Sequence, residues 1–409
     1  MAQYQPWLDT STDPTIQLLV PNNRLDNLSL PNPLVTVSNF DTQIKEGNSP
    51  VDTSLVNVTN LKTLQTMESY LSLSCGLKIL QSANPFKAIS KSLFVDNSGI
   101  EIANLDALYN FSQTRGGLLA PLSPDPIVYC LLGGAPGGVG QYMQYRLPNS
   151  FGYAMSLTSE QGGRPWDHNH LDKRVLRITD GEDGTGDLIS NADWMAHWIK
   201  NDATISGNVT PAKLRKDNLG VDIVIGLAYL DRTDDLSRER DNFKLLVAQS
   251  LTALQVLWPD GTMILKCVGA NTRATADLII ILSRHFEKVN MMQPLTMDPS
   301  SDKFYLICQK FVKQPIVDST VNLLREIHEK QRLGHSVAKL LMVPSPETDL
   351  SIKHYNNLFL QRRLLVLQIV KDVILLIENG QKEQAQKVLN KFVPRFNLYK
   401  TSIFWNLPS

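Results

Sequence analysis

The segment VYCLLGGAPGGVGQYMQYRLP, from Val128 to Pro148, decides how the rest of the chain is interpreted. It begins as a short apolar run, passes through a glycine-rich turn and continues with helical spacing of apolar residues. Glycine lets the backbone approach a ligand closely, and a helix N-terminus presents free N–H groups. The order G-G-A-P-G-G fits neither a dinucleotide loop (G-x-G-x-x-G) nor a P-loop, which ends in G-K-[ST]. The apolar run also ends on Leu131 and Leu132 rather than on a carboxylate.

Bulk composition excludes few classes of function. The chain has 409 residues, of which 43% are hydrophobic and 20% are charged, as in an ordinary globular protein. Lys+Arg and Asp+Glu are equal at 40 each, so any basic surface must be local. The four cysteines are far apart, and most lie in apolar runs, which predicts buried, reduced thiols rather than a zinc knuckle. They are Cys75, Cys130, Cys267 and Cys308.

No membrane segment is expected. The N-terminal stretch MAQYQPWLDTSTDP has neither a basic region nor an apolar core, so it is not a signal peptide. The most apolar stretch, LLVLQIVKDVILLI, is interrupted by Lys371 and Asp372 and is too short to span a bilayer.

Short apolar runs alternate with helical patterns between Pro126 and Phe311. The runs are PIVYCLL (126–132), FGYAMSLT (151–158), RVLRIT (174–179), VDIVIGLAYL (221–230), TMILKCVG (262–269) and KFYLICQKF (303–311). Helical patterns cover 138–145, 191–200, 236–257 and 274–285. This alternation predicts an α/β fold with a doubly wound, mostly parallel sheet and helices on both of its faces.

The flanking regions differ in composition. Residues 1–58 are rich in Asn, Pro, Ser, Thr and Asp, which predicts an extended or partly disordered arm. Residues 59–125 form a helical lead-in, with helices at 61–81 and at 98–117, the second opened by Ser98 and closed by Gly116. Residues 126–311 are the α/β domain.

Residues 312–409 are expected to be a helical extension without strands, with long helices at 321–342 and 354–380. Its basic residues favour a solvated helix face, with an RNA groove or a partner surface as alternatives.

Several segments in order resemble the FtsJ-type RNA 2′-O-ribose methyltransferases, and in particular the viral and eukaryotic branch that acts on mRNA caps. Their S-adenosylmethionine loop is similar to GGAPGGVGQY (133–142). The other similar segments are FVDNSGIEIANLDALYNF (94–111), DGEDGTGDLIS (180–190), DGTMILKCVG (260–269) and LSRHFEKVNMMQPLTMDPSSDKFYLIC (282–308), the last including a Phe-Glu-Lys-Val turn. The resemblance implies a methyltransferase-type (Rossmann-like) sheet with a capped-mRNA partner, and a cytoplasmic or virion-associated location.

The resemblance also implies a catalytic set, Lys-Asp-Lys-Glu, of which one member is kept. The central lysine corresponds to Lys266. The first lysine falls at Glu101 and the last glutamate at Lys303, so both charges are reversed. The aspartate falls at Leu227. Glu101 and Lys303 are therefore predicted to pair with each other as an exchanged couple.

The resemblance to the family's cofactor site holds for some residues and fails for others. The loop residues that would hold S-adenosylmethionine are kept: Gly133, Gly134, Ala135, Pro136, Gly137 and Gly138. Asp183 and Asp187 are candidates for the adenine amino group, and a plain Gly/Asp turn is the alternative. Ser156, Thr158 and Glu160 stand where a ribose-binding acid is expected. We therefore expect binding of S-adenosylmethionine to be weak or lost.

Two other features have simple explanations. WDHNH (166–170) lacks the spacing of a closed zinc site, so a surface loop is expected and no metal is predicted. Trp194 with Trp198, and Phe94 with Tyr109, could stack bases, but helical spacing favours core packing.

Three functions stay open. The chain is an active cap 2′-O-methyltransferase using Lys266, a degenerate methyltransferase that binds RNA, a cap or a partner protein, or a structural subunit. If the helical extension is a partner surface, the alternative to a solvated face, its expected partners are other proteins of a capping, replication or virion complex.

Overall fold

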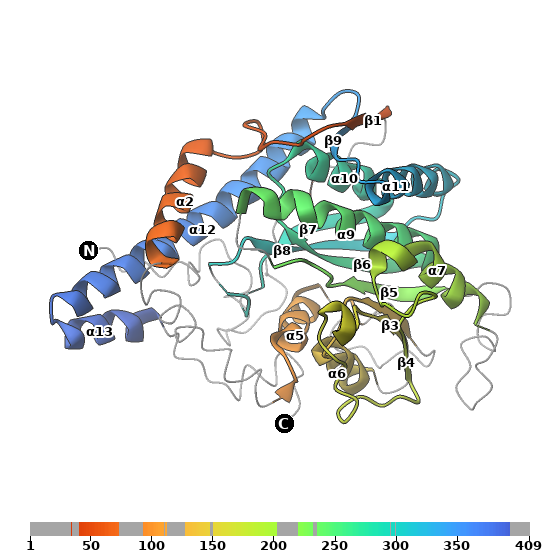
Figure 1. The fold of residues 1–409 in the computed structure, drawn as a ribbon, viewed down its shortest axis with the longest axis horizontal. Helices are drawn as coiled ribbons and strands as arrows, with labels where there is room; N and C mark the ends of the chain where they lie inside the picture. Colours follow the sequence, from red (N-terminus) through yellow and green to blue (C-terminus); the bar gives the residue numbers. More distant parts are fainter. Residues whose placement is uncertain are drawn as a thin grey trace, which may run out of the picture.

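The computed structural model describes residues 34, 41–72, 93–109, 111–112, 127–147, 150–202, 220–231, 235–294, 296–298 and 300–392. Its centre is a seven-stranded sheet in the order β4-β3-β2-β5-β6-β8-β7 (Figure 1). In that order the strands are Leu176–Thr179, Phe151–Met155, Val128–Leu132, Val221–Gly226, Leu257–Val268, Lys303–Phe311 and Phe286–Met292. Neighbouring strands run parallel, except that β8 is antiparallel to both β6 and β7. The predicted doubly wound, mostly parallel α/β sheet is confirmed.

Helices cover both faces of this sheet (Figure 1). On one face lie α5 and α6, and on the other lie α7, α9, α10 and α11. Their bounds are Asn97–Tyr109, Gly138–Arg146, Leu188–Asn201, Asp235–Val256, Arg273–Ser283 and Ile316–Arg332. Successive strand side chains point to opposite faces, so Tyr129 and Leu131 join the core under α5, whereas Cys130 and Leu132 join the other core.

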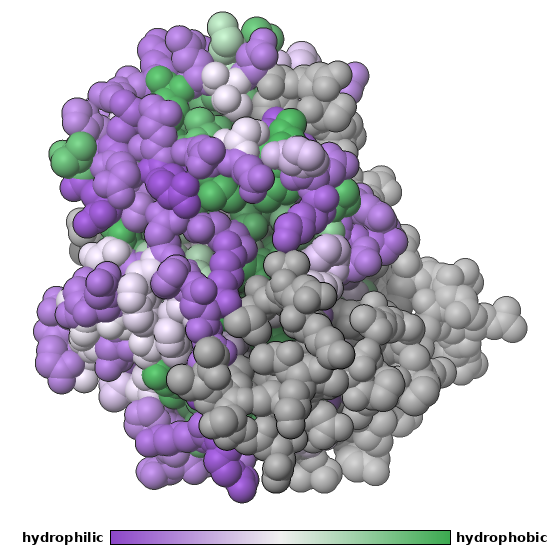
Figure 2. Space-filling model, turned by 90° about the vertical axis from the view of Figure 1, so that its right-hand side faces the viewer, coloured by the Kyte–Doolittle hydropathy of each residue, from purple (hydrophilic) through white to green (hydrophobic). Residues whose placement is uncertain are grey.

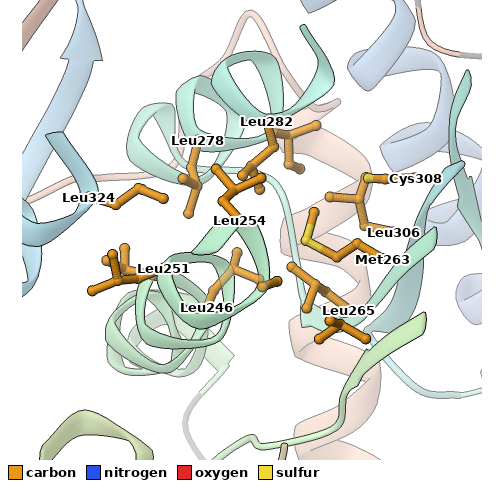
Figure 3. Close-up of a cluster of buried hydrophobic side chains, with 14 of the residues drawn as sticks. Leu246, Leu251, Leu254, Met263, Leu265, Leu278, Leu282, Leu306, Cys308 and Leu324 are labelled. Carbon is orange, nitrogen blue, oxygen red and sulfur yellow. The ribbon is translucent and has the colours of Figure 1, made fainter. Parts of the chain in front are cut away.

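The larger core lies between the sheet and the α9 layer. Figure 3 shows part of it, where side chains from α9, β6, α10, β8 and α11 meet. Cys130, Cys267 and Cys308 are free thiols buried in this core, as predicted, and Cys75 lies outside the described residues. The expected core packing of the aromatic pairs is also confirmed. Trp194 and Trp198 stack with ring centroids 5.8 Å apart and pack against this core, whereas Phe94 and Tyr109 are buried in the core beneath α5.

The extension after Phe311 is not purely helical, and the helix predicted over 321–342 is wrong in its second half. Helix α11 ends at Arg332, and β9 (Val337–Leu341) follows after Gly334, which has a left-handed φ of 89°. Buried Val337, Leu340 and Leu341 have the i, i+3, i+4 spacing that is typical of a helix, so the local pattern favours the wrong element.

Strand β9 pairs with the N-terminal part of the chain. Its antiparallel partner is β1 (Thr42–Glu46), and the two form a separate two-stranded sheet. The described part of the predicted arm therefore includes a paired strand. Asp277 in α10 supports β9, because its carboxylate accepts the N–H groups of Leu340 and Leu341 at 2.7 and 3.0 Å.

Two further local expectations are corrected. Ser98 does not cap α5, because it lies inside the first turn, where Asp96 accepts both its N–H and its hydroxyl. The Phe-Glu-Lys-Val segment is the beginning of strand β7 rather than a turn. The remainder of the second predicted helix, up to Gly116, lies largely outside the described residues.

The C-terminal helices extend from the α/β domain. Helix α12 (Pro346–Glu378) packs against α2 (Val58–Ser72) through a third apolar cluster, and α13 (Lys382–Phe392) follows it. Arg363 of α12 is buried, with its guanidinium 2.5 Å from the carboxylate of Glu68 in α2. Within the described ranges, no helix is long and apolar enough to cross a membrane. The described part of the face in Figure 2 is mostly hydrophilic, with apolar residues in narrow strips.

Candidate functional site

Lys266 lies in a buried ion pair beneath α5. Its Nζ is 2.7 Å from Oε2 of Glu101, and the two side chains are 9% and 8% exposed. The hydroxyl of Tyr305 donates a second hydrogen bond, of 2.6 Å, to the same carboxylate oxygen. Antiparallel pairing sets Lys266 of β6 directly opposite Tyr305 of β8, so both side chains leave the sheet on the α5 side. Three elements therefore converge on one carboxylate.

The electrostatics of this pair keep the lysine charged. Burial alone would lower the pKa of Lys266, but the carboxylate of Glu101 outweighs it, and the pKa of Lys266 lies above its ordinary value. Burial, followed by Glu101, raises the pKa of Tyr305 well above its ordinary value. An ammonium and a neutral phenol therefore share Glu101 near neutral pH.

A second ion pair lies at the mouth of the same site. Lys303 Nζ is 3.2 Å from Oδ1 of Asp231 and 4.3 Å from the ring centroid of Tyr229. The same ring lies 5.5 Å from Nζ of Lys266, so the Tyr229 ring lies close to both ammonium groups. Cation–π contacts of this kind add to each ion pair.

The predicted pairing of Glu101 with Lys303 is wrong. Glu101 pairs with Lys266, and Lys303 pairs with Asp231. The register of β6 and β8 explains part of this arrangement. Lys303 is opposite Val268, and Val268 lies on the same face of β6 as Lys266, so Lys303 and Lys266 lie on the same side of the sheet. Its neighbour Asp302 instead forms an ion pair of 2.9 Å with Arg238 of α9.

The position expected to hold the aspartate is apolar. Leu227, just after β5, is 6% exposed and belongs to the apolar cluster beneath α5. Tyr229 and Tyr305 were missed by the sequence reasoning. Alternation from Lys303 along the strand would have placed Tyr305 on the same face, whereas nothing in the local pattern identified Tyr229.

The glycine turn is tightly packed against the protein itself. A Cβ on Gly133 (φ 78°) would lie 2.5 Å from the backbone N of Ala228. A Cβ on Gly134 would lie 3.1 Å from the ring of Trp166, and one on Gly137 (φ 123°) would lie 2.7 Å from Leu171. The left-handed backbone and close contacts of Gly133 and Gly137 therefore favour glycine at both positions, whether or not a ligand is bound.

The rest of the turn is held by the loop that follows β3. The carbonyl of Pro136 accepts the N–H of Asp167 at 2.8 Å. The N–H of Ala135 lies 3.4 Å from Oγ of Ser156, and a Cβ on Gly138 would clash with the carboxylate of Asp96.

The two acids proposed for adenine both stabilise their own loop. Asp187 caps α7 by accepting the N–H of Ile189 at 3.0 Å. Asp183 accepts hydrogen bonds from Thr185 and from the amide of Asn191, and the Asn191 bond leads in lowering the pKa of Asp183. Their contact with adenine stays a prediction.

The WDHNH loop is on the surface, as expected. His168 and His170 are exposed, and His170 pairs with Asp167 at 2.8 Å. Among the described residues, no group of three or more His, Cys, Asp or Glu side chains is arranged to hold a metal ion.

Known proteins share this domain. Residues 102–311, just over half of the chain, match the model of the FtsJ-like methyltransferase family. The cap-specific mRNA (nucleoside-2′-O-)-methyltransferase 1 of Drosophila melanogaster is 24% identical over 241 residues, which are 55% of this chain and 28% of that protein. Its namesake in Dictyostelium discoideum is 21% identical over 348 residues, 76% of this chain and 42% of that protein.

The chain thus spans less than half the length of these curated relatives. A solved ribosomal RNA methyltransferase of Plasmodium falciparum is 16% identical with a TM-score of 0.36, covering 54% of this chain and 99% of that one. The family match covers the seven strands of the central sheet, including Lys266 in β6, and begins one residue after Glu101 in α5. The chain belongs to the FtsJ-like methyltransferase family.

Proposed function

We propose that this FtsJ-family protein binds RNA and does not transfer methyl groups. The observation that carries the proposal is the buried ion pair of Glu101 with Lys266, next to the apolar Leu227. The cap-specific relatives support RNA as the partner.

The charge reversal at Glu101 changes the chemistry of Lys266 in an unfavourable direction. Methyl transfer to a ribose hydroxyl needs a group that accepts or weakens the hydroxyl proton. A lysine does this best when its pKa is lowered, as a like-charged neighbour would do. Here the neighbour is a carboxylate that raises the pKa of Lys266, so the side chain is an ammonium without a free lone pair.

The residues around the glycine turn fit S-adenosylmethionine poorly. Ser156 stands where the ribose-binding acid is expected, and the end of β2 has Leu131 and Leu132. Trp166 and Leu171 pack against the glycines that would face the cofactor. The turn is explained by its packing alone, so we assign no step to the cofactor in this chain.

An exposed basic loop beside the turn is the proposed RNA contact. It carries Arg164 and Lys173, both exposed, and Trp166 joins it to Gly134. Positive side chains of this kind bind phosphates without reading sequence.

An active cap 2′-O-methyltransferase is the second candidate. It is favoured by the place of Lys266 in β6, which corresponds to the central lysine of the family, and by the intact glycine turn. Asp231 near Lys303 would then supply the missing carboxylate.

The deciding experiment uses the full chain. Calorimetric titration with S-adenosylmethionine and S-adenosylhomocysteine is followed by a methyl-transfer assay on capped RNA with the same sample. RNA binding is measured by fluorescence anisotropy for the wild type, for Arg164→Ala/Lys173→Ala and for the control Lys62→Ala/Lys387→Ala, which loses two exposed charges elsewhere.

We expect RNA binding without methyl transfer, with binding weakened by the loop substitutions and retained in the control. Methyl transfer that Lys266→Arg abolishes, in a variant that melts like the wild type, would establish the active enzyme instead. Absence of RNA binding by the wild type would overturn the RNA part of the proposal.

A further inference from the structure

A pocket of about 160 Å³ lies on the opposite side of the sheet from Glu101 and Lys266. It is bounded by α9, by the beginning of α10 and by the connection between α11 and β9. Its polar lining includes Ser49, Arg240, Lys244, Gln331 and His335. Ser49, Gln331 and His335 lie outside residues 102–311, so about half of the pocket is built by parts of the chain beyond the family match.

Two cations in the lining have no partner among the residues that the structure describes. Arg240 and Lys244 are four residues apart on α9, and neither forms an ion pair or a side-chain hydrogen bond with any residue in the described ranges. Like charges at this spacing on a helix repel each other slightly, and a bound anion would remove that repulsion.

The carboxylates near the pocket leave a positive excess. Glu239 turns away, because its two oxygens accept the N–H groups of Asn271 and Thr272 at 2.9 Å. Glu46 pairs with His335 at 3.0 Å and with Lys330 at 2.8 Å. Asp241 lines the pocket and offsets one charge.

Gln331 gives a second, independent sign of a missing partner. Its Oε1 is buried and has no hydrogen-bond partner among the described residues. Buried amide groups are normally satisfied, and an amide can turn to present either its oxygen or its NH₂ group. Its NH₂ group would suit a ligand oxygen, next to two cations that suit the charge of that ligand.

We propose that this pocket binds the phosphate group of a phosphorylated ligand. Arginine forms paired hydrogen bonds with phosphate oxygens, and lysine adds a point charge. The ligand is either a free nucleotide or the 5′-phosphate end of an RNA, and the two share the phosphate group that Arg240 and Lys244 would hold. This site does not depend on the proposed function, because it shares no lining residue with the Glu101 site.

The test is binding to the full chain of four probes: pyrophosphate, GTP, and a short RNA with either a 5′-phosphate or a 5′-hydroxyl. The variant is Arg240→Ala/Lys244→Ala. The control is Lys62→Ala/Lys387→Ala, which removes the same charge from exposed sites on α2 and α13. Circular dichroism and thermal melting establish that each variant is folded.

We expect the dissociation constant of at least one phosphorylated probe to rise about tenfold or more in the pocket variant and to stay unchanged in the control. Pyrophosphate and GTP binding would identify a free nucleotide. Discrimination between the two RNAs would identify an RNA 5′ end. No binding of any probe at millimolar concentration, or binding that Arg240→Ala/Lys244→Ala leaves unchanged, would overturn the proposal.

Discussion

At the scale of single residues, one carboxylate decides the character of the site. Glu101 accepts hydrogen bonds from both Lys266 and Tyr305 at less than one-tenth exposure. A buried charge is costly unless it is paired, so the two ionised side chains depend on each other. The residue identities were readable from the sequence, but the choice of partner was not, because Glu101 and Lys266 are 165 positions apart.

This dependence predicts a large effect of Glu101→Gln. We expect it to lower the free energy of unfolding by about 3–5 kcal/mol, because Lys266 would be left as an uncompensated buried charge. Glu101→Gln/Lys266→Met should recover most of that loss. Urea denaturation measures both variants.

The matched control is Glu287→Gln, which breaks the exposed pair of Glu287 with Lys310 at the same 2.7 Å distance. Solvent screens that pair, so we expect little change. Equal effects of Glu101→Gln and Glu287→Gln would contradict the role assigned to burial.

At the scale of elements, the glycine turn between β2 and α6 is held by steric contacts. Gly133 has a left-handed φ and lies against the backbone of Ala228, which cannot move like a flexible side chain. Gly184 has a similar φ of 69° but no atom within 4 Å of an added Cβ. Comparing an alanine substitution at Gly133 with one at Gly184 therefore separates the cost of steric crowding from the cost of a left-handed backbone.

We expect Gly133→Ala to destabilise the ligand-free protein by at least about 2 kcal/mol more than Gly184→Ala. Thermal melting of the two variants without added ligand makes the comparison. If Gly133→Ala melts no lower than Gly184→Ala, the turn is not kept by packing, and a ligand role for its glycines gains support.

At the same scale, β1 and β9 show the limit of local patterns. The apolar runs identify every buried strand of the central sheet except β7, whose polar start at Glu287 and Lys288 favours a turn. The buried residues of β9 have spacings of three and four, which favour a helix. Pairing with β1 and tertiary hydrogen bonds to Asp277 and Ser49 select the extended form.

At the scale of the whole molecule, His285 predicts how stability depends on pH. It is 1% exposed where α10, β8 and α11 meet, with Nε2 2.9 Å from Thr320 Oγ1. Burial, with the nearby Arg284, lowers the pKa of His285 to about 4. In the unfolded chain His285 takes up a proton near pH 6.5, whereas in the folded chain it does so only near pH 4. The free energy of unfolding that His285 contributes is therefore lost as the pH falls from 6.5 to 4.

Compared with wild type, His285→Gln should show a shallower loss of stability between pH 6.5 and pH 4. The measurement is the difference in unfolding free energy between the two proteins at several pH values. Subtracting one protein from the other isolates the effect of His285. Burial raises the pKa of Asp277 and Glu239, and these two carboxyl groups make the free energy of unfolding rise, not fall, as the pH is lowered. Parallel curves for the two proteins would show that His285 titrates normally.

Local patterns in the sequence were enough to predict the fold class and the glycine turn, whereas the match of Glu101, Lys266 and Lys303 to the catalytic positions of the family stays a prediction. The fold class and the turn follow from spacings of two to four residues and from short motifs, which depend on local backbone geometry. Only the tertiary structure decided that Glu101 neutralises Lys266, that β1 pairs with β9, and that Arg240 and Lys244 face a pocket reached by Ser49 and His335. Such contacts join segments far apart in the chain, and their partners are chosen by burial and charge after the sheet has formed.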